Sequence, residues 1–155
     1  MKVQYKFDPF KLVGISKRKI DDKDKVLKDV KDYVLEQVLD HIGDSVSPVT
    51  GKQFKALKKS YKTLKNKEGG TPVPNLELTG SMLDSLKVEI EGDKLVLKVS
   101  ESEAPKADNH NKFSAASKRT PLPARKFIPN SRDDETFSSD IIKGIKGIIE
   151  DASEE

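Results

Sequence analysis

Residues 86–99 constrain the fold more than any other part of the chain, because apolar and polar side chains alternate there on both sides of a Gly92–Asp93 pair. Such alternation is typical of half-buried β-strands, and Gly–Asp favours a two-residue hairpin loop. With the loop at that pair, the facing residues are Glu91 with Lys94, Ile90 with Leu95, Val88 with Leu97 and Leu86 with Val99. Apolar side chains face apolar ones, and the remaining pair has opposite charges. The sequence therefore predicts an antiparallel hairpin over residues 86–99.

The segment over residues 21–42 predicts a long amphipathic helix. Apolar residues recur there in steps of three and four, at Val26, Leu27, Val30, Val34, Val38, Leu39 and Ile42. This spacing places them on one face of an α-helix. The acidic residues Asp21, Asp22 and Asp24 suit the positive end of its dipole, and Gly43 is a suitable stop.

Two more helical segments are predicted between this helix and the hairpin. Residues 52–67 form a basic segment whose apolar face holds Phe54, Leu57, Tyr61 and Leu64. Thr79 or Ser81 can then cap a single helical turn through Asp84 and Ser85.

A last helix is predicted over residues 137–150, capped by Ser138 or Ser139. Isoleucines occur there at helical spacing, at Ile141, Ile142, Ile145, Ile148 and Ile149. Gly144 and Gly147 each weaken the helix by about 1 kcal/mol relative to alanine. The helix therefore needs a surface to pack on, either within its own chain or on another subunit.

These elements predict one α+β domain spanning residues 1–155, in which the long helix and the basic second helix pack on a small antiparallel sheet. Residues 1–20 show little periodicity and are interpreted as an N-terminal arm. Residues 101–120 are polar and irregular, so we expect a mobile loop there. The helix over residues 137–150 then completes the domain.

Composition narrows the functional classes. The chain has no cysteine, which excludes a disulfide framework, a thiolate zinc site and a cysteine nucleophile. Its 29 basic and 26 acidic residues leave a net charge of +3, too small for a general attraction to nucleic acid or membranes. No apolar run approaches the ~20 residues of a membrane span, so we expect a soluble protein with no membrane partner, made in a cytoplasm.

The sequence offers little support for catalysis, a metal or a cofactor. Its histidines are His41 and His110, and a hydrolase would have to use one of them as its base. His41 is expected to be a structural residue at the end of the long helix, and His110 has no second histidine nearby. Neither a nucleophile elbow nor a phosphate-binding loop is present, so we expect a protein that acts by binding, without cofactors.

The basic segment has two interpretations. Its lysines could neutralise nucleic-acid phosphates non-specifically while its aromatic residues stack on bases. Of the seven lysines in this segment, the candidate DNA-facing residues are Lys52, Lys55, Lys58, Lys59, Lys62 and Lys65. They could equally form a solvated helix face, because the aromatic residues belong to its apolar side.

Several local motifs, in this order, resemble those of the phage virion morphogenesis or tail completion proteins, which are related to neck and minor tail proteins of tailed phages. SPVTGKQFKALKKSY resembles the segment that leads from a glycine turn into a basic helix. LELTGSMLDSLKVEIEGDKLVLKV is similar to the family's helix-to-hairpin unit, NHNKF to its loop, and LPARKFIPNS to the elbow before its final helix. The resemblance covers about residues 26–149. Lys126 stands where the family usually has proline, and only Ala107, His110 and Phe113 represent its usual loop pattern.

This resemblance implies a structural virion protein, present in the host cytoplasm during assembly. Its copies would form a ring, hexameric in related neck proteins, that completes or terminates the tail and joins it to the head connector. The implied partners are further copies, connector or neck proteins, tail tube or terminator proteins, and packaged DNA for the lysine face. The motif residues are Leu78, Thr79, Gly80, Leu83, Ser85, His110, Phe113, Pro123, Ala124, Arg125 and Phe127. The first five would form a fold-nucleating turn and the last four the elbow that presents the final helix.

Overall fold

The computed structural model describes residues 2–54, 80–119 and 124–153. The helices are α1 (Pro9–Val13), α2 (Lys23–Gly43), α4 (Gly80–Asp84), α5 (Ala104–Asn111), α6 (Ala115–Lys118) and α7 (Ser139–Ser153). The strands are β1 (Gln4–Phe7), β2 (Lys87–Glu91) and β3 (Lys94–Lys98), and short 3-10 turns lie at Lys17–Lys19, Glu101–Glu103 and Ser131–Asp133. The fold is α+β, as the sequence predicts.

The sheet is antiparallel with strand order β1-β3-β2. The predicted pairs Glu91–Lys94, Ile90–Leu95 and Val88–Leu97 are confirmed. The fourth pair, Leu86 with Val99, falls just outside the paired strands, which end at Lys87 and Lys98. Gly92 has a φ of 63°, a left-handed conformation that glycine adopts without strain and that the tight loop requires.

The interpretation of residues 1–20 as an arm was wrong, because they contain a strand of the sheet. Val3, Tyr5 and Phe7 are buried while the residues between them are exposed, so this segment is a half-buried strand with a short apolar pattern. β1 pairs with β3, for example Tyr5 with Leu97. Asp8 then caps α1 by accepting hydrogen bonds from the amides of Phe10 and Lys11.

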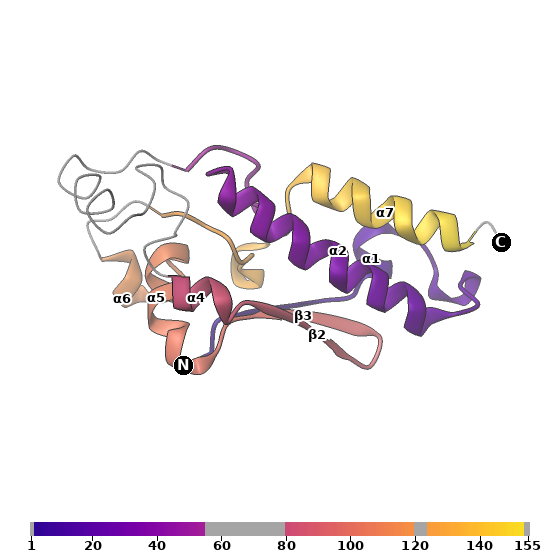
Figure 1. The fold of residues 1–155 in the computed structure, drawn as a ribbon, viewed down its shortest axis with the longest axis horizontal. Coiled ribbons are helices and arrows are strands. Elements are labelled where there is room, and N and C mark those ends of the chain that lie inside the picture. Colours follow the sequence, from indigo (N-terminus) through magenta and orange to yellow (C-terminus); the bar gives the residue numbers. More distant parts are fainter. Residues whose placement is uncertain (1, 55–79, 120–123, 154–155) are drawn as a thin grey trace.

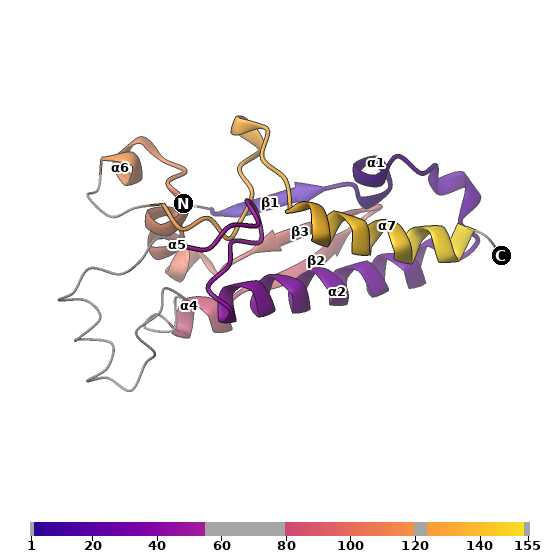
Figure 2. The same ribbon diagram turned by 90° about the horizontal axis from the view of Figure 1, so that it is seen from above.

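Helices α2 and α7 lie side by side over one face of the sheet (Figures 1 and 2). α2 buries most of the predicted stripe, but Leu39 is 39% exposed and does not belong to the core. α7 buries Ile141, Ile145 and Ile149 completely, so the surface that this helix requires is provided by its own chain. Figure 2 shows α7 running alongside α2, with which it is in contact.

An aromatic cluster anchors β1 to the start of α7. The rings of Tyr5 and Phe7 stack with centroids 5.4 Å apart, and Phe137 meets both of them edge-on. Edge-on aromatic contacts stabilise a core beyond the area they bury. The first strand is thereby fixed to a segment more than a hundred residues away in the sequence.

The expectation of a loop over residues 101–120 was also wrong, because the described part of this segment is mostly helical. α5 begins at Ala104 and α6 ends at Lys118. Ala104, Ala107 and Asn111 are buried, and they bring α5 against the rest of the domain. Hydropathy does not reveal this helix, because the side chains that it buries are small or polar.

Candidate functional site

The motif residues that the structure describes gather at one end of the molecule. Gly80 and Leu83 belong to α4, His110 lies in α5, and Phe113 follows α5 and packs against the core. Figure 1 shows α4, α5 and α6 grouped at this end. Leu78, Thr79 and Pro123 lie outside the described residues, and so do Lys55, Lys58, Lys59, Lys62 and Lys65. The basic helix is therefore untested, and Lys52 is an exposed residue of a turn.

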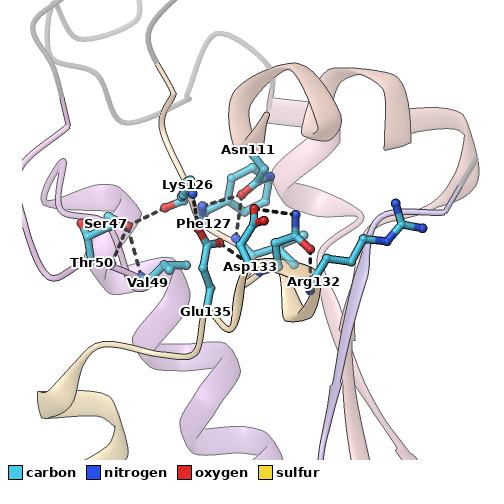
Figure 3. A network of polar contacts seen from close by, with 11 residues as sticks. Ser47, Val49, Thr50, Asn111, Lys126, Phe127, Arg132, Asp133 and Glu135 are labelled. Atoms are coloured by element: carbon cyan, nitrogen blue, oxygen red, sulfur yellow. Dashed lines mark hydrogen bonds and ion pairs between the residues drawn. The ribbon is translucent and has the colours of Figure 1, made fainter. Parts of the chain in front are cut away.

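The elbow, residues 124–138, is the segment that connects this end to α7. Asn111 fixes it from one side, because its buried Oδ1 accepts hydrogen bonds from the amides of Phe127 and Ile128, at 2.8 and 2.9 Å. Its Nδ2 donates to the carbonyl of Ala107 at 2.7 Å. Figure 3 shows the amide of Asn111 facing the elbow backbone. One side chain thus satisfies two buried backbone donors, which would otherwise destabilise the fold.

Ser47 holds the elbow from the other side. Its hydroxyl donates to the carbonyl of Lys126 at 2.6 Å and accepts from the amides of Val49 and Thr50, each at 3.1 Å (Figure 3). The amide of Ser138 donates to the carbonyl of Pro48 at 2.7 Å. The turn after α2 therefore positions both the middle of the elbow and the residue that precedes α7.

Arg125 and Phe127, the central elbow residues of the motif, are buried. Phe127 is 0% exposed and Arg125 is 4% exposed. The amide of Arg125 donates to the carbonyl of His110 at 2.7 Å, so the structure does bring these two motif residues together. Ala124, by contrast, is exposed. The buried pair holds the chain together and is not available to a partner in this fold.

Polar side chains within the elbow also form an ion pair and hydrogen bonds with one another. Lys126 forms an ion pair with Glu135, whose other carboxylate oxygen accepts from the amide of Asn130 at 3.0 Å (Figure 3). The side chain of Asn130 in turn accepts from the amide of Arg132 and donates to Asp133. Lys126 thus has a structural partner within the elbow.

Ser85 and Asp108 brace the neighbouring elements. The Ser85 hydroxyl donates to the carbonyl of Met82 at 2.8 Å and accepts from the amide of Ser100 at 3.2 Å, so it links the end of α4 to the end of the hairpin. Burial raises the pKa of Asp108, but the hydroxyls of Ser114 and Ser117 and the Ser114 amide hold that pKa below its ordinary value. Asp108 therefore remains a buried carboxylate that joins α5 to α6.

His41 links the end of α2 to the start of α7. Its Nδ1 lies 2.7 Å from the carbonyl of Gln37, and its Nε2 lies 2.9 Å from a carboxylate oxygen of Asp140. The hydrogen bond from the Ser138 hydroxyl is the main cause that lowers the pKa of Asp140, and His41 lowers this pKa further. Asp140 is accordingly a carboxylate that links the end of α2 to the first turn of α7. A catalytic triad needs its histidine between the acid and the serine, whereas here Asp140 lies between Ser138 and His41.

The described residues contain no group of three or more histidine, cysteine or acidic side chains placed to hold a metal ion. Within the same residues, no helix has the length and apolarity needed to cross a membrane. Comparison of the chain with protein-family models, curated proteins and solved structures gave no match.

Two residues that matter to the elbow, Ser47 and Asn111, were not among the predicted motif residues. Both lie within the quoted motifs, in SPVTG and NHNKF. A serine directly before proline can form a hydroxyl-capped turn, which is the available signal for Ser47. Asn111 gives no comparable signal, because its partners are backbone amides sixteen and seventeen residues later.

Proposed function

We propose that this protein is a structural component of the head–tail junction of a tailed phage. Its copies form a ring that completes the tail and joins it to the head connector, and it acts by binding other virion proteins. The observation that carries the proposal is the order of the helix-to-hairpin, loop and elbow motifs along the sequence.

The structure supports this proposal through the way in which those motifs are assembled. The elbow is clamped by Ser47 and Asn111 and leads directly into α7, so the motif segments act together to position the last helix. The exposed surface is rich in charges, and the hydrogen-bonded elbow fixes the geometry of the chain. These properties suit a subunit that repeats identical contacts around a ring.

The experiment is to interrupt this gene in the phage that encodes it and to examine lysates by electron microscopy. The expected result is that heads and tails accumulate unjoined, or that tails have abnormal ends, and that the intact gene supplied on a plasmid restores particles. Normal infectious particles without the protein would overturn the proposal.

A second measurement uses the purified chain. Light scattering is expected to show a discrete ring, formed alone or on addition of connector or tail proteins. A chain that remains monomeric with every such component would contradict the proposal. Arg125 and Phe127 are unsuitable for this test, because substituting such buried residues measures folding.

A further inference from the structure

An acidic stripe runs along the exposed side of α2. Carboxylates follow one another there in steps of three and four, at Asp29, Asp32, Glu36 and Asp40, and the C-cap residue Asp44 continues the series; all five are exposed. Steps of this size place them on one side of the helix, away from the buried valines. From Asp29 to Asp40 the stripe is about 16 Å long at 1.5 Å per residue.

From Asp32 to Asp40 the acidic stripe is unfavourable for the isolated chain, whereas Asp29 and Asp32 each have a lysine four residues earlier, Lys25 and Lys28. Like charges four residues apart destabilise a helix by about 0.2–0.5 kcal/mol per pair, and acidic residues near its C-terminus oppose the dipole. None of the five carboxylates forms an ion pair with another described residue. Such a conflict between local preference and structure is expected where a partner supplies the opposite charge.

The opposite side of the molecule carries an excess of lysines. Tyr5, Phe7, Leu95 and Leu97 face the helices, so alternate residues of the strands face away from them. The charged residues of this outer sheet face are Lys2, Lys6, Lys87, Lys94 and Lys98, together with Glu89 and Glu91, and they surround a buried central residue, Val96. In Figure 1 the helices α2 and α7 lie on the other side of the sheet.

Among the described residues, some lysines of the outer sheet face have an ion-pair partner and others have none. Glu89 pairs with Lys87 at 3.0 Å and with Lys98 at 2.6 Å. Lys2, Lys6 and Lys94 form no ion pair with any residue in the described ranges.

Two hollows provide space for acidic side chains beside these lysines. One of about 260 Å³ has Lys2, Lys87 and Lys98 in its wall with one acidic residue, Glu101, and another of about 500 Å³ has Lys6, Lys11 and Lys94 with one, Asp8. They lie toward opposite ends of β1. Along one strand, Lys94 and Lys98 are about 13 Å apart at ~3.3 Å per residue. This spacing is comparable to the length of the acidic stripe.

We propose that the acidic stripe of one copy docks on the outer sheet face of the next copy, which gives the ring its repeating contact. This inference rests on the proposed function. The glutamates on the sheet favour a protein partner over nucleic acid, because a phosphate backbone is uniformly negative. The two surfaces lie on opposite layers of the chain, so the contact is head-to-tail, and head-to-tail contacts generate rings or filaments.

The test uses two charge-reversal variants and their mixture. Asp32→Lys with Glu36→Lys makes both surfaces basic, and Lys6→Glu with Lys94→Glu makes both acidic. Each variant alone is expected to associate at least about tenfold more weakly than the wild type, since attractive contacts become repulsive. A mixture of the two is expected to assemble again, with the variants alternating. Assembly is measured by light scattering at low salt and, because exposed charges are screened, at high salt.

Matched controls separate this contact from a general effect of charge. Asp21→Lys with Asp151→Lys changes the net charge as much as the stripe variant does, but outside the stripe, and Lys19→Glu with Lys118→Glu serves likewise for the sheet variant. All four positions are exposed. Both controls are expected to assemble like the wild type, and circular dichroism checks that every variant is folded.

The outcomes distinguish this inference from the proposed function. If the wild type assembles and the two reversal variants assemble equally well, the docking surfaces are wrong and the ring proposal stands. If each variant fails alone and the mixture also fails, the two surfaces do not face each other. A wild type that never assembles refutes both ideas. If the sheet variant loses salt-sensitive binding to duplex DNA but assembles normally, the occupant is nucleic acid and this inference is overturned.

Discussion

Alanine substitutions at the two glycines of α7 are expected to have different effects on stability. In a helix interior, alanine is favoured over glycine by about 1 kcal/mol. At Gly147 an added Cβ would meet nothing within 4 Å, so Gly147→Ala is expected to raise the free energy of unfolding by about that amount. At Gly144 the added Cβ would overlap Oη and Cζ of Tyr33 and would lie 2.7 Å from its Cε2. The α2–α7 contact is therefore closest where Tyr33 lies against Gly144.

Gly144→Ala must displace the Tyr33 ring, which is half-buried on α2. Fully burying a large apolar side chain contributes about 1.5–3 kcal/mol, so losing a half-buried ring costs about 1 kcal/mol, and the shift of the helices adds to this. The gain in helix propensity is thus cancelled or exceeded. We expect the two variants to differ by about 1–3 kcal/mol, or several degrees in Tm for a domain of this size.

The assay is urea unfolding followed by circular dichroism, with both substitutions also made in a Tyr33→Ala background. There the obstacle is absent, so Gly144→Ala is expected to stabilise the chain as Gly147→Ala does. The reasoning is refuted if Gly144→Ala stabilises the chain as much as Gly147→Ala while Tyr33 is present.

Two further predictions concern the polar contacts that position α7. Asn111→Ala leaves the amides of Phe127 and Ile128 buried without an acceptor, which is expected to lower the free energy of unfolding by about 2–4 kcal/mol. Urea unfolding measures this change, and a decrease of less than about 0.5 kcal/mol would contradict the role of Asn111 in holding the elbow. Asp140 has a pKa lowered from its ordinary value of 3.8, so its contribution to stability is present above that pH and is lost as the pH falls through the lowered pKa. The difference in stability between the wild type and Asp140→Asn is therefore expected to shrink below about pH 4; a difference that stays constant from pH 6 to pH 2 would contradict the assigned interactions.

The parts of the fold that depend on residues close together in the sequence could be predicted from it. The hairpin register follows from alternation around Gly92 and Asp93, and the buried face of α2 follows from its helical period. β1 was missed although Val3, Tyr5 and Phe7 alternate with polar residues, because the pattern is short and its partner strand is about ninety residues away. For the same reason the sequence gives no direct sign of the opposed charges on the two layers.

The motif located the elbow, but the contacts that hold the elbow in place could not be predicted from the sequence. The resemblance implies that Arg125 and Phe127 belong to the elbow that presents the last helix, and the structure shows both buried. The clamps are polar contacts made by Ser47 and Asn111 to backbone atoms far along the chain. Because every residue has a backbone amide or carbonyl, a side chain that bonds to the backbone does not constrain the type of its partner residue. A sequence pattern therefore cannot reveal such a contact.

The sheet order β1-β3-β2 has a consequence for protein synthesis. β1 ends at Phe7 and its partner strand begins at Lys94, so the ribosome adds most of the chain before the two can pair. At ~5–20 residues per second, the delay is roughly 4–17 s. During that time the apolar side of α2 also lacks the strands that cover it, which makes the nascent chain a candidate for chaperone binding. β1 therefore stays unpaired until β3 has been made.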